Sequence, residues 1–267
     1  MTNIIVAGPR GQMGQEALRM IARENHFKLV ACIDRKYDGK SVANIPSLPK
    51  IDAPIFTDAK TCLEQVDAHI LLDLTIPDVG YKHTKLALQN KIRPVVGTTG
   101  FTAEHINELT TLAKQQKTGA IIAPNFAIGA ILMMKFSQMA AKYFPDVEII
   151  EKHHDQKIDA PSGTAIKTAE MINEQRTPKI QGHPSAYETI KHARGADIEG
   201  LKIHSMRLPG LVAHQEVIFG SEGQTLSIKH DSLNRQSFMP GIKLAIEQVI
   251  ELDELIYGLE NIPYFRN

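Results

Sequence analysis

Residues 148–167 read EIIEKHHDQKIDAPSGTAIK and bring several reactive types of side chain together. His153 and His154 are adjacent, Lys157 follows four positions after the first histidine, and a Ser-Gly-Thr turn occupies 162–164. Imidazole exchanges protons near neutral pH, and an ammonium group stabilises anions. The segment is open to three interpretations: a metal site, an acid/base site beside an anion-binding turn, or an ordinary polar loop.

A metal site is the least favoured of the three. Adjacent residues on an extended chain point to opposite faces, so His153 and His154 do not readily bind one ion. The H-E-x-x-H spacing of helical zinc sites is absent, and no cysteine lies nearby. Asp155 and Asp159 could act as ligands, but nothing indicates a tetrahedral set. We therefore expect no metal.

Acid/base chemistry fits the segment better. Lys157 is near enough to His153 for its ammonium group and one imidazole to face the same cavity. Ser162 is suited to cap the helix that follows, with the N–H groups of Gly163 and Thr164 pointing outward. Such a helix start binds a carboxylate or a phosphate. A polar loop with an ordinary cap remains the alternative at this point.

A second candidate site follows the first expected strand. The turn GPRGQMG spaces Gly8, Gly11 and Gly14 as G-x-x-G-x-x-G, a variant of the dinucleotide-binding G-x-G-x-x-G. Glycine lets the backbone approach a pyrophosphate closely, and the helix start supplies N–H groups. The motif is weak when it stands alone, because a glycine turn needs no ligand.

Asp34 strengthens the nucleotide interpretation. It ends the second expected strand, 20 residues after Gly14, where an acid contacts the ribose hydroxyls in such folds. Arg35 and Lys36 follow at once and could accept the 2′-phosphate of NADP, or could form a solvated loop. We expect both NADPH and NADH to be used, with a preference for NADPH.

Two further strand ends carry small and polar residues, in DLTIP (73–77) and GTTG (97–100). Both fall at carboxyl ends of expected strands, where ligands bind in open α/β sheets. Gly97, Thr98 and Thr99 offer backbone and small side chains to a nicotinamide. Each turn could equally be a simple strand-to-helix connection.

The scaffold for these residues follows from the apolar pattern. Buried parallel strands are expected at 3–8, 28–34, 68–75, 93–99 and 119–125, with helical stretches such as 12–24 and 78–90 between them. This alternation predicts an α/β domain with a Rossmann-like, doubly wound parallel sheet.

The second half of the chain has a different pattern. A helix at 127–144, a strand at 146–153, a helix near 163–175 and a polar stretch precede three closely spaced strands within 201–231. Short turns between these strands predict a second α+β domain built on a mixed or antiparallel sheet. An amphipathic helix at 241–252 follows.

Composition narrows the range of partners. The chain has 267 residues, of which 43% are hydrophobic, and its 30 basic and 30 acidic residues cancel. Neither nucleic acid nor a membrane is expected as a partner. The start of the chain lacks the pattern of a secretory signal, and Cys32 and Cys62 form no disulfide framework or metal spacing. A cytoplasmic protein is the expectation, with Cys32 buried.

The string EKHHDQKIDAPSGTA closely resembles the signature of the 4-hydroxy-tetrahydrodipicolinate reductase family, formerly called dihydrodipicolinate reductase, of diaminopimelate and lysine synthesis. The segments GxxGxMG, DLTIP, VVGTTG and APNFAIG occur in the family's order and roughly its spacing. The resemblance covers essentially the whole chain. It implies NAD(P)H-dependent reduction of a small cyclic imine dicarboxylate that carries a 4-hydroxyl group.

The resemblance implies roles for individual residues. His153 matches the proton donor, Lys157 its substrate-contacting partner, and His154 a substrate-binding histidine. Gly163 and Thr164, beside the cap Ser162, match the pair that holds a substrate carboxylate. With the residues singled out above, the expected cofactor contacts are Gly8, Arg10, Gly11, Gln12, Met13, Gly14, Asp34, Arg35, Lys36, Thr75, Gly97, Thr98, Thr99, Pro124, Asn125 and Phe126.

The chain departs from the family at three positions. Gln12 stands where arginine is common, and Arg10 could replace that arginine as a phosphate contact. Asp155 and Gln156 stand where a basic Arg-His pair is common. The loss of these positive groups leaves Lys157 more responsible for the charge of the substrate.

Family members are usually homotetramers built through the sheet of the second domain, and their last helix returns to the nucleotide domain. We therefore expect a dinucleotide-binding domain of residues 1–126 plus 240–267. Residues 127–239 are expected to form the substrate-binding and oligomerisation domain. Closure of the two domains would exclude water and set the distance for hydride transfer.

Two other functions fit parts of the pattern. An acylating semialdehyde dehydrogenase needs a nucleophilic cysteine, but Cys32 and Cys62 lie in the cofactor half without a paired base. A non-catalytic NAD(P) sensor would keep the glycine turn and Asp34, but has no reason to keep His153 and Lys157 together. Turnover distinguishes the sensor from the reductase.

Overall fold

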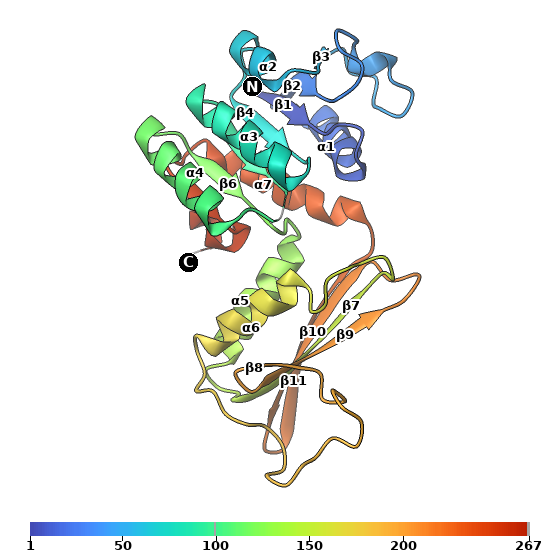
Figure 1. Ribbon diagram of the computed structural model, residues 1–267, viewed down its shortest axis with the longest axis vertical. Coiled ribbons are helices and arrows are strands. Elements are labelled where there is room, and N and C mark those ends of the chain that lie inside the picture. The colour runs from blue at the N-terminus through green and yellow to red at the C-terminus, as the bar shows by residue number, and fades with distance from the viewer. Residues whose placement is uncertain (99, 266–267) are drawn as a thin grey trace. The chain divides into compact units, whose positions relative to one another are not determined.

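The computed structural model describes residues 1–98 and 100–265. Thr99, an expected cofactor contact, lies outside the described residues. The chain divides into two compact units, Met1–Phe126 with Phe238–Asn267 and Ala127–Ser237. Each unit has its own sheet (Figure 1).

The first unit is built on a seven-stranded sheet in the order β12-β6-β5-β4-β1-β2-β3. Each neighbouring pair of strands runs parallel. The order reverses at β1, which has β2 on one side and β4 on the other, and ligands bind at such reversals. The strands are β1 (Thr2–Ala7), β2 (Phe27–Ile33), β3 (Ile55–Phe56), β4 (Ile70–Asp73), β5 (Arg93–Val96), β6 (Ala120–Ile122) and β12 (Leu255–Tyr257).

Helices cover both faces of this sheet. One layer holds α2 (Ala59–Gln65), α3 (Pro77–Gln89) and α4 (Ala103–Gln116), and the other holds α1 (Gln12–Arg23) and α7 (Met239–Val249) (Figure 1). With both faces covered, the strands are continuously apolar, and Ile4, Ile5 and Val6 are all fully buried. Cys32 is buried as expected, and Cys62 is buried as well.

The second unit contains a five-stranded mixed sheet in the order β11-β10-β7-β9-β8. Its central pair, β7 and β9, is parallel, and the other pairs are antiparallel. The helices α5 (Ile128–Ala140) and α6 (Gly163–Asn173) pack together over one face (Figure 1). The strands are β7 (Asp146–His153), β8 (Ala196–Ile198), β9 (Leu201–Arg207), β10 (Ala213–Ser221) and β11 (Gln224–Ser232).

Alternation along β7 decides which side chains face α5 and α6. Val147 and Ile149 are buried on that face, while Glu148 and Ile150 are directed to the other. The next residue of the buried row is Glu151, which is fully buried. A carboxylate thus occupies a position in which the pattern calls for an apolar side chain.

The expected fold class is confirmed, because the structure has a doubly wound parallel sheet and a separate mixed sheet. The outer strands β3 and β12 were not expected, since two and three residues are too few to show a periodicity. The strands expected at 68–75 and 93–99 end earlier, at Asp73 and Val96. In the described part of the chain, none of the helices has the length and apolar character that a bilayer crossing requires.

Candidate active site

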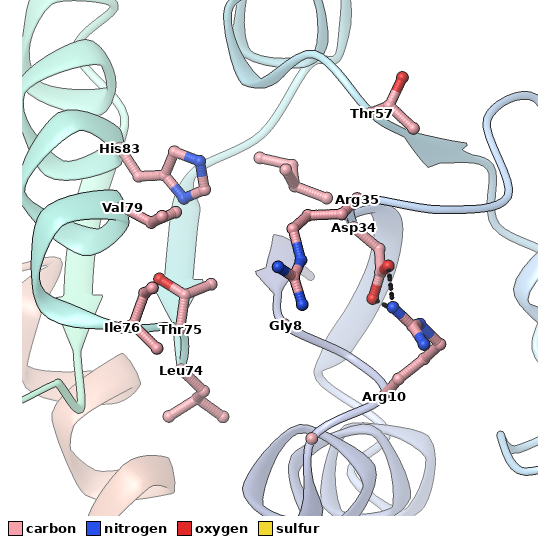
Figure 2. A pocket seen from close by; sticks show the side chains of 12 residues that line it. Gly8, Arg10, Asp34, Arg35, Thr57, Leu74, Thr75, Ile76, Val79 and His83 are labelled. Carbon is pink, nitrogen blue, oxygen red and sulfur yellow. Dashed lines mark hydrogen bonds and ion pairs between the residues drawn. The ribbon is translucent and has the colours of Figure 1, made fainter.

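A cavity of about 420 Å³ opens at the carboxyl ends of β1, β2 and β4 (Figure 2). This is the place where the strand order reverses, and where a doubly wound sheet binds nucleotides. The lining residues are Gly8, Arg10, Gly11, Ile33, Asp34, Arg35, Thr57, Leu74, Thr75, Ile76, Val79 and His83.

The glycine turn between β1 and α1 forms the floor of this cavity. Gly8 has a φ of +81°, which disfavours any residue with a side chain. A Cβ atom on Gly14 would lie 2.1 Å from the carbonyl oxygen of Gly8, so the helix can pack this closely only without a side chain. Gly11 precedes α1 without a side-chain cap among the described residues. The first N–H groups of α1 can therefore bind phosphate, and the turn fits a dinucleotide.

Asp34 and Arg10 form an ion pair at the edge of the cavity (Figure 2). Arg10 donates two hydrogen bonds, from Nε to Oδ2 at 2.9 Å and from NH2 to Oδ1 at 2.7 Å. The backbone N–H of Lys36 also donates to Oδ1. Asp34 is the residue expected to bind the ribose, and both of its carboxylate oxygens thus already accept hydrogen bonds. In Figure 2, Arg35 extends into the cavity between Asp34 and Thr75.

The loop after β4 is held by a buried carboxylate, Asp73. Asp73 accepts hydrogen bonds from the backbone N–H of Thr75 at 3.0 Å and from its hydroxyl at 2.6 Å. His83 Nδ1 lies 2.7 Å from the other oxygen of Asp73, and the Thr98 hydroxyl donates to the carbonyl of Thr75. Sequence reasoning missed Asp73 and His83, because their contact depends on how α3 packs against the sheet.

The other expected cofactor residues differ in their burial. Gly97 lies beside Phe126, whose ring would be 2.9 Å from a Cβ atom at position 97, and Phe126 is buried. Gln12, Lys36 and Pro124 are exposed and do not line the described cavity. Met13 and Asn125 are half-buried. Their cofactor contacts remain predictions.

In the second unit, His153 at the end of β7 is paired with Glu151. The Nδ1 atom of His153 lies 2.5 Å from Oε2 of Glu151. The two residues are two positions apart on a strand, so their side chains share one face. The fully buried carboxylate therefore determines the direction of the imidazole ring.

Glu151 has further partners from distant parts of the chain. Arg207 donates two hydrogen bonds to it, from NH1 to Oε2 at 2.9 Å and from NH2 to Oε1 at 2.8 Å. The backbone N–H of Ser162 donates to Oε1 at 3.2 Å. Burial disfavours the charged carboxylate, but hydrogen bonds from His153, Arg207 and Ser205 outweigh it and lower the pKa of Glu151 to about 2.

The start of α6 lies in the same cluster. The hydroxyl of Ser162 accepts from the N–H of Ala165 at 3.2 Å, so Ser162 caps the helix as expected. Gly163 is exposed at the first helical position. Lys157 Nζ lies 2.6 Å from Asp159 Oδ1, and this ammonium lowers the pKa of Asp159.

Sequence reasoning did not identify Glu151 or Arg207 as site residues. A signal for Glu151 was present, because a charged residue two positions before His153 on a strand shares its face. No such signal existed for Arg207, which lies opposite His153 in the register of β7 and β9. Arg207 also donates to the carbonyl of Asp159 at 2.7 Å, and so holds the loop that carries Lys157.

The thiols of the chain do not support an acylating dehydrogenase. Cys32 and Cys62 are both buried in the first unit. Burial raises the pKa of both thiols, that of Cys62 to about 12. A nucleophilic cysteine must form a thiolate near neutral pH, so neither residue is suited to that role.

The similarity to known proteins extends over nearly the whole chain. Residues 2–126 match the family described as dihydrodipicolinate reductase, N-terminus, and residues 129–262 match dihydrodipicolinate reductase, C-terminus. The 4-hydroxy-tetrahydrodipicolinate reductase of Oceanobacillus iheyensis is 64% identical over 261 residues, which are 97% of this chain and 98% of that protein. The reductase of Bacillus mycoides is 60% identical over 259 residues, 97% of each chain. The chain belongs to the 4-hydroxy-tetrahydrodipicolinate reductase family.

Solved structures agree with this assignment. Dihydrodipicolinate reductase from Paenisporosarcina sp. TG-14, solved with dipicolinate bound, is 53% identical with a TM-score of 0.88, and the match covers 98% of this chain and 99% of that one. An amine dehydrogenase from Mycobacterium smegmatis has a TM-score of 0.72 at 15% identity, over 100% of this chain and 97% of that one, and shares the fold alone. The expected family is confirmed, and with it an NAD(P)H-dependent oxidoreductase of diaminopimelate and lysine synthesis.

Acid titration tests the buried carboxylate. The pKa of Glu151 is lower in the folded protein than its ordinary value of 4.5, so its contribution to stability is present above pH 4.5 and is lost as the pH falls toward 2. Glu151→Gln lacks this contribution. We expect the gap in unfolding free energy between wild type and variant to shrink by roughly 3 kcal/mol over that range, measured by urea denaturation and circular dichroism. A constant gap would contradict this prediction.

Proposed function

We propose that the chain reduces 4-hydroxy-tetrahydrodipicolinate with NADPH or NADH, and that the cluster around His153 provides the proton. Membership of the reductase family supports the reaction. The 2.5 Å contact between His153 and Glu151, beside the start of α6, is the observation that supports His153 as the proton donor.

The cofactor and the substrate bind to different units of the chain. Residues 1–126 with 240–267 bind the dinucleotide through the glycine turn and the strand ends around Thr75 and Thr98. Residues 127–239 bind the substrate. A bound reduced nicotinamide supplies a hydride to the substrate ring. Every other group that the reaction needs belongs to the chain, and no metal takes part.

The substrate is a small cyclic imine dicarboxylate, which loses its 4-hydroxyl group as water to give a conjugated imine. Hydride addition at ring C4 then gives an enamine, which takes a proton at C3. His153 donates this proton, because its ring is held at the end of β7 and is only partly exposed. A histidine is suited to proton transfer near neutral pH.

The remaining residues of the proposed site bind the negatively charged groups of the substrate. Ser162, Gly163 and Thr164 begin α6, where backbone N–H groups and the helix dipole favour a carboxylate. Lys157 stabilises the ring nitrogen or the second carboxylate, and must leave Asp159 to do so. His154 is half-buried next to the donor and completes the substrate contacts.

Turnover tests the reaction and the donor together. Substrate is generated in situ from pyruvate and aspartate semialdehyde by the preceding synthase, and oxidation of NADPH or NADH is followed by absorbance. We expect turnover that is insensitive to EDTA. His153→Ala and Lys157→Ala should lower kcat by about 10²- to 10⁴-fold, because each removes a group that acts in the transition state.

The control for this experiment is His183→Ala, which removes an exposed histidine of the same unit. NADPH fluorescence should report unchanged nucleotide binding in all three variants. Normal turnover by His153→Ala or Lys157→Ala would overturn the role of that residue. Nucleotide binding without any turnover by wild type would favour a non-catalytic NAD(P) sensor.

The ion pair of Arg10 and Asp34 supports a preference for NADPH. The hydroxyls of NADH need free lone pairs on the carboxylate, but Asp34 already accepts three hydrogen bonds on its roughly four lone-pair sites. The 2′-phosphate of NADPH needs positive charge, and Arg10 and Arg35 both line the cavity. By neutralising Asp34, Arg10 also removes a charge that would repel the phosphate.

Arg10→Ala tests this preference. Charge-assisted hydrogen bonds are worth about 1.5–3 kcal/mol, so kcat/KM for NADPH should fall by roughly 10- to 100-fold while that for NADH changes less. Lys40→Ala is the matched control, because Lys40 lies over the same Tyr37 ring as Arg10, whereas the ion pair of Asp34 among the described residues is with Arg10. Equal losses for both nucleotides in Arg10→Ala would contradict the proposal.

The second sheet is the proposed centre of a homotetramer. Its face opposite α5 and α6 carries Ile150, Met206 and Ile218, and Met206 is exposed. The edge strand β11 is also largely exposed over its nine residues. Exposed apolar groups and a long free edge favour association with other copies.

Sedimentation velocity tests the assembly. We expect a species of four times the 29.6 kDa chain mass. Ile218→Lys should dissociate it, because the new charge would be buried against another copy. Glu170→Lys, an exposed position on α6, is the control and should sediment as wild type does. A monomeric wild type at micromolar concentration would reject the tetramer.

A further inference from the structure

Glu151 breaks the apolar pattern of the strand on which it lies. The buried row of β7 reads Val147, Ile149 and Glu151, and all three face α5 and α6. A buried carboxylate is costly unless it is paired and hydrogen-bonded. The groups that donate hydrogen bonds to Glu151 therefore indicate the role of this charge in the site.

The donors to Glu151 come from three separate segments. They are the imidazole of His153 on its own strand, the guanidinium of Arg207 and the side chain of Ser205 near the end of β9, and the N–H of Ser162 before α6. Each segment carries or holds a different part of the proposed site: the proton donor, the loop of Lys157, and the carboxylate-binding helix start. One carboxylate thus connects all three.

The charge of Glu151 also determines which nitrogen of His153 carries a proton. An ionised carboxylate has lone pairs and no proton, so it can only accept hydrogen bonds. The Nδ1 atom of His153 at 2.5 Å must therefore be the donor. This leaves Nε2 as the nitrogen that exchanges protons. In the neutral ring Nδ1 keeps its hydrogen and Nε2 has none.

We propose that Glu151, held by Arg207, is the positioning residue of His153. It keeps the ring in the Nδ1–H form, stabilises the imidazolium, and sets the position of the ring relative to the start of α6. In the reaction the Nε2–H bond breaks, a C–H bond forms at the enamine carbon, and a neutral Nδ1–H imidazole remains. The inference deepens the proposed function, because it takes His153 as the donor.

Arg207 has a separate part in this arrangement. Two parallel hydrogen bonds from a guanidinium give a carboxylate a fixed orientation as well as an opposite charge. The pair therefore keeps Glu151 from taking the proton of His153. Arg207 also donates to the carbonyl of Asp159, so the same side chain holds the loop beside the donor.

The chain contains a matched control on the opposite face of the same strand. Glu148 on β7 lies 2.8 Å from His204 Nε2 and also pairs with Arg194. Glutamate, histidine and arginine thus occur together twice, once on each face of the sheet. Glu148→Gln removes the same charge from the same strand without touching His153.

The histidine tautomer provides the first test. Two-bond ¹H–¹⁵N spectra of ¹⁵N-histidine-labelled protein, recorded where the imidazoles are neutral, distinguish Nδ1–H from Nε2–H, and His153→Gln assigns the signal. We expect Nδ1–H for His153 in wild type and in Glu148→Gln. In Glu151→Gln, Arg207 holds the amide oxygen, the amide N–H₂ faces the ring, and the tautomer should change to Nε2–H. An Nε2–H ring in wild type would overturn the proposal without any variant.

Kinetics provides the second test. Glu151→Gln should lower kcat by about 10²-fold or more while the KM for NADPH stays within twofold, because the cofactor residues lie in the other unit. Glu151→Asp restores the charge, so it should recover the Nδ1–H signal and part of kcat. A fall in kcat with the tautomer unchanged would reduce Glu151 to a structural role and reject the inference.

These results separate the inference from the proposed function. If wild type showed no turnover, the proposed function would fail, while the spectra would still report the bond between His153 and Glu151. If wild type turned over and Glu151→Gln matched it, only the positioning role would fail. Sedimentation of each variant shows whether assembly has changed.

Discussion

A buried negative charge is the constraint around which the second unit is arranged. Breaking a buried ion pair by removing one partner costs about 3–5 kcal/mol, so the folded unit is considerably more stable when Glu151 keeps its donors. Those donors lie on β7, at the end of β9 and before α6. Folding of the unit therefore assembles the candidate site, because the carboxylate is satisfied only when these three segments are in place.

In the first unit, too, buried carboxylates accept hydrogen bonds from neighbouring segments, here at the ends of the parallel strands. Asp73 at the end of β4 is fully buried, and it holds the Thr75 loop and His83. Asp34 after β2 holds Arg10 and the backbone of Lys36. Both carboxylates lie where the strand order reverses, next to a helix start with N–H groups for an anion. Loops that line the cavity are in this way given a defined shape by buried carboxylates.

These two arrangements differ in what they leave available to a ligand. Around Glu151 every oxygen is committed to the protein, which suits a group that positions another residue. Around Asp34 the partner Arg10 is itself partly exposed at the cavity edge, with its side chain 31% accessible. An exposed guanidinium can exchange one anion for another, and this is why Arg10 is expected to influence the choice of nucleotide.

The amino-acid pattern was sufficient for the doubly wound sheet, the mixed sheet, the glycine turn and the cap at Ser162. Each of these depends on local periodicity or on the conformational preference of a few neighbouring residues. The family, too, could be assigned from short motifs such as KHHDQKIDAPSGT, because their order and spacing are specific.

The partners of the charged groups could not be assigned in this way. Arg207 lies 56 positions from Glu151, and His83 meets Asp73 only after α3 has packed against the sheet. Lys157 pairs with Asp159, a contact that no pattern in the sequence predicted. Strand register and helix packing bring such groups together, and both are properties of the folded chain that no local pattern encodes.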